Sequence, residues 1–404
     1  MVPFNPTPPR ETNPTMSAPD PQNQPTKPIT KADVVFTIAT PRQRILSWEL
    51  NGASWAPPMT IAQYVGRETA LSETALSANG GTTYYVLHPK DDPETIVSAC
   101  EVTAKRALVV RGGGAGGVGG VEEVTAYAIA SVFTNPVFRE LGMASFMLRQ
   151  VQQAVDGKGA EFGALYSDIG REYYTRLGWK DFRSPQVLLA LAEGLVLPRL
   201  SAGGGDGVKF LTADEVASLC VEDTALVQKR FATAAVRSNN NDDARSKHIT
   251  FLPTKEQMAW HFTRDAYVCK TLLGREVINR GAQTEDGGAW VYWDHDLREK
   301  KLKILRIVTR EELEADREKT KAAIKKLLFA ALSEAKDWGL PKVLLWEPNA
   351  DVVDIATEFW SELGPNLSVT FEEREDGSIP SLRWKGGESL VGVVWDMNDY
   401  YAWC

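Results

Sequence analysis

The order of apolar and polar residues predicts strands and helices in alternation along most of the chain. Between residues 142 and 155, apolar side chains recur every three or four positions, as on one face of a helix: Met143, Phe146, Met147, Val151 and Val155. Residues 122–134 and 162–167, on either side of this helix, are mostly apolar runs of strand length. The other elements expected in the first half are strands at 33–39, 83–88, 95–111 and 179–191, and helices from residue 41 and at 59–77. This alternation predicts an α/β (α+β) fold.

The second half of the chain repeats this order of elements. After a helix at 254–273, we expect strands at 289–294, 302–310 and 343–346, and helices at 311–338 and 352–363. Two interpretations stay open: a degenerate second copy of the first unit, or an unrelated α+β cap.

Proline and glycine clusters suggest where the units begin and end. Residues 1–30 contain nine prolines and few aliphatic residues, so we expect a disordered tail. A glycine-rich loop at 201–207 separates a first domain, 31–195, from a second, 207–404. The glycine-rich run at 112–120 lacks the Lys-Ser/Thr of a phosphate loop, so we interpret it as the connection of a hairpin.

Composition and charge limit the classes of function. With 404 residues, of which 43% are apolar and 24% charged, the chain has the balance of a globular protein with two domains. The net charge of −8 disfavours nucleic acid as a partner and suits a cationic amine substrate. No apolar run is long enough to span a membrane, and no signal segment is recognisable at the start. We therefore expect a cytoplasmic protein without a membrane partner.

The cysteines give the same picture of the compartment. Cys100, Cys220, Cys269 and Cys404 lie far apart and form no Cys-x-x-Cys pair. This spacing argues against a zinc site or a disulfide scaffold and fits a reducing environment. We expect no metal.

A candidate anion site lies where the strand at 122–134 leads into the helix. The residues there have the form Arg139-x-x-Gly142-x-Ala144. The small residues Gly142 and Ala144 would let a diphosphate approach the backbone, and the N–H groups from Leu141 to Ser145 lack partners at a helix start. Arg139 adds a positive charge for phosphate oxygens. An ordinary helix start with a small residue at a packing contact is the alternative.

These residues carry a family resemblance. The segment from Thr134 to Ala144 resembles the acyl-CoA diphosphate motif of the GNAT N-acetyltransferase superfamily, and Tyr173-Tyr174-Thr175-Arg176-Leu177-Gly178-Trp179 resembles the helix that follows it. Together with the strand at 131–134, the segment 165–170 and the Trp-rich tail, they are most similar to the fungal lysine N(6)-acetyltransferase family. The resemblance covers the chain from about residue 33 to its end and implies a GNAT acyl-CoA N-acyltransferase fold with a mixed central sheet.

The resemblance also implies the roles of individual residues. The CoA diphosphate would lie on Arg139, Leu141, Gly142, Met143, Ala144 and Ser145, and backbone N–H groups of Val132, Phe133 and Thr134 would serve pantetheine and the oxyanion. Tyr174 would protonate the departing CoA sulfur, while neighbouring Tyr173 packs the helix on the sheet. If the second half is a GNAT-like unit, it has lost the glycine turn and should not bind CoA.

Proton removal and amine recognition are less well defined by the sequence. Asp168 is the nearest acidic candidate for the proton of the incoming ammonium, but it is equally well interpreted as a helix N-cap. The aromatic tail should be buried, so its Asp396 and Asp399, or the carboxylate of Cys404, could recognise the amine.

The function that the resemblance implies is acetyl transfer from acetyl-CoA to a primary amine, by direct attack in a ternary complex. The expected acceptor is the ε-amino group of free L-lysine, as in lysine catabolism. Alternatives are another small amine, such as a polyamine or a toxic amino compound, or a non-catalytic acyl-CoA-binding protein. The sequence does not determine the oligomeric state.

Overall fold

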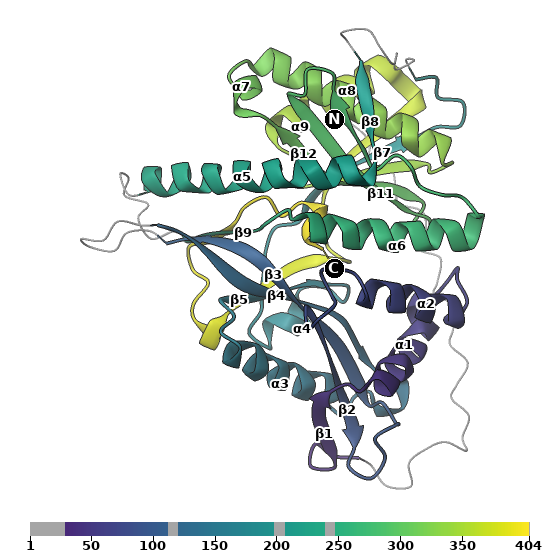
Figure 1. Ribbon diagram of the computed structural model, residues 1–404, viewed down its shortest axis with the longest axis vertical. Helices are drawn as coiled ribbons and strands as arrows, with labels where there is room; N and C mark the ends of the chain where they lie inside the picture. Colours follow the sequence, from purple (N-terminus) through teal and green to yellow (C-terminus); the bar gives the residue numbers. More distant parts are fainter. Residues whose placement is uncertain (1–28, 112–119, 198–206, 239–246, 404) are drawn as a thin grey trace, which may run out of the picture.

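The computed structural model describes residues 29–111, 120–197, 207–238 and 247–403 (Figure 1). Most of the proline-rich tail, nearly all of the glycine-rich segment at 112–120, and Cys404 lie outside these ranges. The described residues form two sheets, one in each half of the molecule, and helices α5 (Ala213–Ser238) and α6 (Lys255–Leu273) run between the halves.

The first sheet has the strand order β1-β2-β3-β4-β5-β15-β6. Its strands are β1 (Val34–Ile38), β2 (Thr82–Pro89), β3 (Ser98–Val110), β4 (Val121–Thr134), β5 (Phe162–Ser167), β6 (Lys180–Asp181) and β15 (Ile379–Trp384). Strand β9 (Lys247–Phe251) pairs with β3 and with β16 (Val393–Trp395). β3 and β4 form the expected hairpin, with Val110 opposite Val121.

The second sheet has the strand order β14-β7-β13-β12-β11-β10-β8. Its strands are β7 (Pro185–Leu191), β8 (Val208–Leu211), β10 (Gly281–Thr284), β11 (Ala289–Asp296), β12 (Lys301–Thr309), β13 (Lys342–Trp346) and β14 (Leu367–Glu373).

The two sheets are built on the same plan. Along the main path of each, one parallel pair is flanked by antiparallel pairs: β4 with β5 in the first sheet and β12 with β13 in the second. A helix connects each parallel pair, α3 (Met143–Gly157) in the first and α8 (Arg317–Asp337) in the second. This shared order supports a degenerate second GNAT-like unit and argues against an unrelated cap.

The two units exchange one strand. β15, from near the end of the chain, lies between β5 and β6, whereas β7 lies between β13 and β14. Residues 179–191, expected as one strand of the first half, instead form two: β6 in the first sheet and β7 in the second, because β7 pairs with β13 and β14. The boundary between 195 and 207 stays a prediction, and β9, β15 and β16 cross it to join the first sheet.

Local sequence explains where the helices begin and end. Thr40 and Thr60 each form a capping box, with Gln43 and Gln63, at the start of α1 (Pro41–Trp55) and α2 (Ile61–Ser72). The charged stretch expected as one helix at 311–338 is interrupted before Asp316, which caps α8. The other helices are α4 (Glu172–Thr175), α7 (Glu311–Glu314) and α9 (Ala350–Leu363). α5 was not predicted.

The interior is continuous across the two sheets. Phe162 of β5 and Trp290 of β11 belong to one buried apolar cluster, which also contains Tyr400 and Tyr401 of the short turn η5 (Tyr400–Ala402). The expectation that the aromatic tail is tied down is confirmed. Within the described ranges, no helix is both long and apolar enough to cross a bilayer.

Candidate active site

Strand β4 loses its pairing with β5 before it ends. The two strands pair only at residues 127–129, whereas β4 continues along β3 to Thr134. A bulge lies at this point, where Glu101 of β3 is opposite Ala130 and Ser131 takes a positive φ of 51°. The edge of β4 that faces β5 is therefore open at residues 132–134, where backbone groups are available to a ligand.

The start of α3 follows this open strand end. Gly142 precedes the helix in the left-handed conformation, with φ 70°, and no side chain caps the helix. The N–H groups of its first turn thus keep the open positions of a helix start. The Lys31 ammonium lies 3.6 Å from where a Cβ on Gly142 would stand, and the Arg139 guanidinium lies 5.4 Å from the Phe133 ring centroid. Two cations beside a helix N-terminus favour an anion such as a diphosphate.

Both tyrosines of α4 lie near this helix start, in different environments. Tyr174 is buried, its ring is perpendicular to that of Tyr173, and burial raises the pKa of its hydroxyl. Tyr173, expected to be a packing residue, is half-buried, and its hydroxyl lies 3.1 Å from the hydroxyl of Ser145 in α3. The role of Tyr174 as the acid stays a prediction, and Tyr173 is placed beside the anion site.

A cavity of about 150 Å³, here called the β4 cavity, opens beside the bulge of β4. It is lined by Trp55, Tyr64, Arg67, Glu68, Leu71, Glu101, Ile129, Ala130, Ser131, Tyr166, Asp168, Trp260, Arg264, Arg298 and Trp403. Residues of α1 and α2 line one part of it, as expected for the helices over the acceptor site, and β3, β4, β5, α6 and the tail line the other parts.

Glu101 is the ionisable group closest to the bulge. Its carboxylate accepts a hydrogen bond of 3.0 Å from the indole N–H of Trp48. Burial, reinforced by the negative charge of Glu68, raises the pKa of Glu101 to about 8. Glu68 is itself paired with Arg67, whose Nε donates to it at 2.9 Å. A carboxylate with a pKa near neutral, inside a cavity, is suited to accept a proton.

Sequence reasoning did not single out Glu101 or Glu68. Glu101 sits in an apolar strand as one alternating polar residue, and Glu68 is one of several charged residues in α2. Glu68 and Glu101 come close together only when the chain folds, so no local sequence pattern predicts that they line the same cavity.

The same cavity contains Arg264, whose charged form is favoured by Asp296, Asp294 and Glu68, which raise its pKa without forming an ion pair within 4 Å. Arg264 of α6 stacks near Trp403, with its guanidinium 5.3 Å from the ring centroid, and has no carboxylate within 4 Å among the described residues. Arg298 lies on the rim and is exposed. The cavity therefore provides acidic groups at the bulge and a cationic group on the side of the tail.

Asp168 lies at the edge of the β4 cavity and does not cap a helix. Arg171 is the residue that precedes α4, where no side chain caps the helix. Asp168 instead accepts a hydrogen bond of 2.9 Å from the N–H of Ser378 in the turn between β14 and β15. The N-cap interpretation is therefore wrong, and the role of Asp168 as a proton acceptor stays a prediction.

Comparison with known proteins agrees with this geometry. Residues 196–404 match the family model described as the LYC1 GNAT-like C-terminal domain. The chain belongs to the LYC1 GNAT-like family. Membership indicates an acyl-CoA-dependent N-acyltransferase of the GNAT superfamily. No curated protein matches the sequence.

Solved structures with similar folds are acyltransferases or related to them. One, from Enterococcus faecalis V583 and described as a probable N-acyltransferase, is 12% identical, with a TM-score of 0.51 over 87% of this chain and 72% of that chain. Another, Saccharomyces cerevisiae N-myristoyltransferase with bound myristoyl-CoA, is 11% identical, with a TM-score of 0.51 over 90% of this chain and 82% of that chain. At these identities the similarity shows the GNAT fold alone.

The LYC1 GNAT-like half has no second anion site at the equivalent position. The N-terminus of α8 is capped by Asp316, whose carboxylate accepts from the N–H of Lys319 at 3.2 Å. The acidic helix α7 precedes it. Negative side chains thus occupy the position that α3 leaves open, and the expectation that the second unit does not bind CoA stays a prediction.

The acidic residues of the tail are engaged elsewhere in this half. Asp396 lies 2.7 Å from His248 of β9, and Asp399 lies 2.6 Å from Arg306 of β12. Burial raises the pKa of Asp399 to about 6. Neither residue lines the β4 cavity, and Cys404 lies outside the described residues. Recognition of the amine by these residues stays a prediction, whereas Trp403 does reach the cavity.

Proposed function

We propose that the protein transfers an acetyl group from acetyl-CoA to the ε-amino group of free L-lysine. The observation that carries the proposal is the meeting of three features: the open edge of β4, the uncapped start of α3, and a cavity whose carboxylate has a pKa near neutral.

The residues at the start of α3 fit an acyl-CoA. Gly142 leaves the backbone accessible, the first-turn N–H groups lack a side-chain cap and could bind an anion, and Lys31 and Arg139 supply positive charge. Acyl-CoA supplies an activated thioester carbonyl when it is bound. Backbone N–H groups at residues 132–134 would stabilise the negative charge that develops on the carbonyl oxygen.

Two side chains would move the protons. An alkyl ammonium has a pKa of about 10.4, so at neutral pH the acceptor amine must lose a proton before it can attack. Glu101 would accept that proton inside the β4 cavity, and Tyr174 would donate one to the leaving sulfur. Asp168, at the edge of the same cavity, remains the alternative acceptor.

The charges of the β4 cavity support an amino acid over a polyamine as acceptor. Glu68 and Glu101 would hold a cationic amine at the bulge, while Arg264, which has no carboxylate within 4 Å among the described residues, would pair with an α-carboxylate. A polyamine carries only positive charge and would leave Arg264 unpaired beside it.

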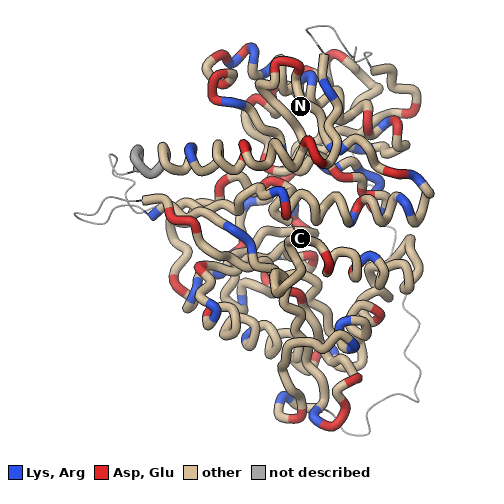
Figure 2. The backbone as a smooth tube through the Cα atoms, in the orientation of Figure 1, with Lys and Arg blue, Asp and Glu red and all other residues tan. Residues whose placement is uncertain are grey.

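The surroundings of the site fit a cytoplasmic enzyme for a small molecule. Figure 2 shows basic and acidic residues interspersed along the described parts of both halves. The described cysteines, Cys100, Cys220 and Cys269, are buried and unpaired, as expected in a reducing compartment.

A CoA-release assay with a panel of acceptors tests the proposal. Acetyl-CoA is supplied with free lysine, ornithine, spermidine or a lysine-containing peptide, and we expect turnover to be highest with lysine. Preferred turnover of spermidine would instead support the polyamine alternative. Binding of acetyl-CoA without turnover of any acceptor would support a non-catalytic acyl-CoA-binding protein.

A further inference from the structure

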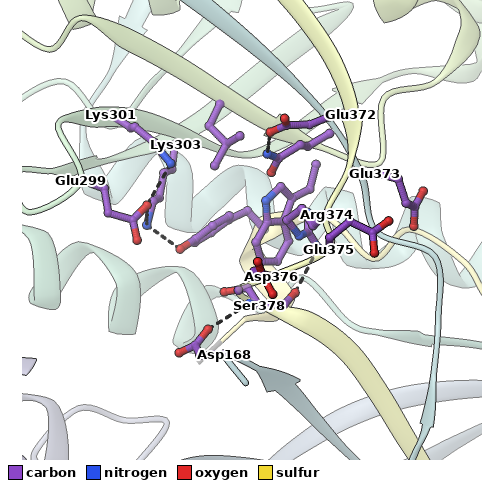
Figure 3. A pocket seen from close by; sticks show the side chains of 15 residues that line it. Asp168, Glu299, Lys301, Lys303, Glu372, Glu373, Arg374, Glu375, Asp376 and Ser378 are labelled. Carbon is purple, nitrogen blue, oxygen red and sulfur yellow. Dashed lines mark hydrogen bonds and ion pairs between the residues drawn. The ribbon is translucent and has the colours of Figure 1, made fainter. Parts of the chain in front are cut away.

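A larger cavity lies between the two units, on the other side of Asp168 from the bulge of β4. It has a volume of about 460 Å³, within the range of about 300–1,000 Å³ that is usual for small-molecule sites. Its wall combines β12 and β13, the end of β14 and the turn to β15, and Tyr400 of the tail (Figure 3). We call it the junction cavity.

The buried guanidinium of Arg374 lies in the wall of this cavity. Arg374 is 8% exposed and stacks on the ring of Trp346, with 3.8 Å between its guanidinium carbon and the ring centroid. Its Nη2 donates to the carbonyl oxygen of Ser378 at 3.2 Å, but Nε and Nη1 have no hydrogen-bond partner. Among the described residues, no carboxylate lies within 4 Å of it.

A buried, charged arginine lowers the stability of the folded protein unless neighbouring groups compensate its charge. Burial lowers the pKa of Arg374 to about 10, which reflects incomplete compensation by its neighbours. Burial and the negative charge of Asp399 raise the pKa of Glu347 to about 7, whereas the positive charge of Arg374 opposes this rise. Among the described residues no ion pair within 4 Å joins Glu347 and Arg374, and Nε and Nη1 of Arg374 stay without hydrogen-bond partners.

The rest of the lining is mainly acidic. Figure 3 shows Asp168, Glu299, Glu372, Glu373, Glu375 and Asp376 around the cavity, against Lys301, Lys303 and Arg374. Both lysines already have acidic partners: Lys301 pairs with Glu299 at 3.1 Å and Lys303 with Asp296 at 2.5 Å. Two of the carboxylates are engaged as well, since Glu373 lies 3.6 Å from Arg171 and Glu372 accepts from Gln186. The wall nevertheless remains mainly acidic and contains a guanidinium with two nitrogens that lack hydrogen-bond partners. No metal-binding group was found among the described residues.

A ligand that satisfies both features carries a carboxylate together with cationic amines. We propose that the junction cavity is a second binding site for a basic amino acid. The carboxylate of the ligand pairs with Arg374, and its amino groups lie among the carboxylates of the β14–β15 turn and Asp168. The proposal concerns binding and not turnover, so it does not depend on the acyl transfer proposed for the β4 cavity.

The two cavities share Asp168, which links the sites physically. Asp168 lines both, and its hydrogen bond from the N–H of Ser378 joins it to the turn that also accepts from Arg374. A ligand on Arg374 would therefore act on the turn that positions Asp168 at the edge of the β4 cavity.

Titration calorimetry on the full chain tests the proposal with L-lysine as the probe. Variants Arg374→Met and Arg264→Met each remove one guanidinium, from the junction cavity and the β4 cavity respectively, and Arg42→Met is the matched control. The Arg42 side chain is 58% exposed and lines neither cavity. We expect two lysine sites in the unaltered protein and in the control, and one in each of the other variants. In Arg374→Met, affinity at the junction cavity should fall at least about tenfold, as expected for loss of a charge-assisted pair.

Further measurements distinguish a loss of carboxylate recognition from a loss of folding in the variants. Cadaverine, which lacks the carboxylate, should bind the junction cavity no better in the unaltered protein than in Arg374→Met. Arg374→Lys, which keeps the charge, should retain part of the affinity, and circular dichroism checks that each variant is folded. Lysine binding, at one site or two, that is unchanged in folded Arg374→Met would overturn the proposal, whereas a single site that is lost in Arg374→Met would support it. Neither result would bear on lysine turnover, which the CoA-release assay measures separately.

Discussion

Replacement of Glu101 by Gln should abolish most of the activity and, at alkaline pH, stabilise the protein. Gln keeps an oxygen that can accept the hydrogen bond from Trp48, so the geometry of the wall should persist. It cannot accept a proton from the substrate ammonium. At pH 8 we expect the turnover number to fall by about 10²–10⁴, the usual contribution of a general base.

The effect on stability follows from the raised pKa of Glu101. Below pH 4.5 both the folded and the unfolded chain hold the proton, so burial of this group costs nothing extra. Between pH 4.5 and about 8 the unfolded chain releases the proton while the folded chain retains it, and stability is lost as pH rises. At about 1.4 kcal/mol per pH unit the loss approaches about 5 kcal/mol by pH 8. Because one side of Glu101 faces the cavity, water screens part of its charge, and we expect a loss of stability of about 2–3 kcal/mol by pH 8.

Two measurements on Glu101→Gln check this reasoning. The free energy of unfolding in urea, measured at pH 5 and pH 8.5, should match the unaltered protein at the lower pH and exceed it at the higher. The kcat/KM of the unaltered protein should rise with pH and level off near pH 8, whereas that of Glu101→Gln should rise about tenfold per unit toward the amine pKa of about 10.4.

A matched control and a clear negative outcome complete the experiment. Glu122→Gln alters a carboxylate that is 61% exposed on the adjacent strand and lines neither cavity, and it should change neither measurement. If Glu101→Gln acetylates lysine at pH 8 within about threefold of the unaltered rate, Glu101 is not the base, and Asp168 becomes the next candidate.

Three further predictions concern the donor and acceptor sites. Tyr174→Phe should lower kcat by about 10²-fold or more with little change in the KM for either substrate, and an unchanged kcat would refute its role as the acid. Gly142→Ala places a Cβ on a left-handed residue, at a cost of about 1–2 kcal/mol, and should raise the KM for acetyl-CoA more than that for lysine; equal effects would argue against diphosphate binding there. Arg264→Met should raise the KM for lysine at least about tenfold while leaving turnover of cadaverine unchanged, and an equal loss with both amines would contradict pairing with the α-carboxylate.

The sequence allowed the first unit to be predicted well because its signals are local. The helical spacing of Met143, Phe146, Met147, Val151 and Val155 marks the buried face of α3. Gly142, directly before the helix, has a left-handed backbone conformation, which favours glycine. Strand and helix periodicity, together with one constrained turn, were enough to place the open helix start after the strand.

The pairing of strands between the units could not be predicted in the same way. β7 and β15 each have the apolar character of a central strand, and their residues do not indicate which of the two sheets each strand joins. The exchange depends on long-range pairing of β7 with β13 and of β15 with β5, so it becomes visible only in three dimensions.

The candidate site shows the same limit. The candidate anion site is continuous in sequence, at residues 139–145, so the sequence alone could indicate it. The β4 cavity is assembled from α2, β3, α6 and the tail, and its Glu68, Glu101 and Arg264 are far apart in the chain. In the sequence, Asp396 of the tail was an equally suitable candidate for binding the amine, but in the structure its carboxylate lies next to His248.

The most direct test of the central claim is identification of the product formed from acetyl-CoA and free L-lysine by the full chain. Mass spectrometry and proton NMR distinguish acetylation of the ε-amino group from that of the α-amino group. We predict N6-acetyl-lysine, formed at a rate that Glu101→Gln reduces by at least about 10²-fold. Absence of acetyl-lysine, or its formation at the same rate by both proteins, would contradict the account.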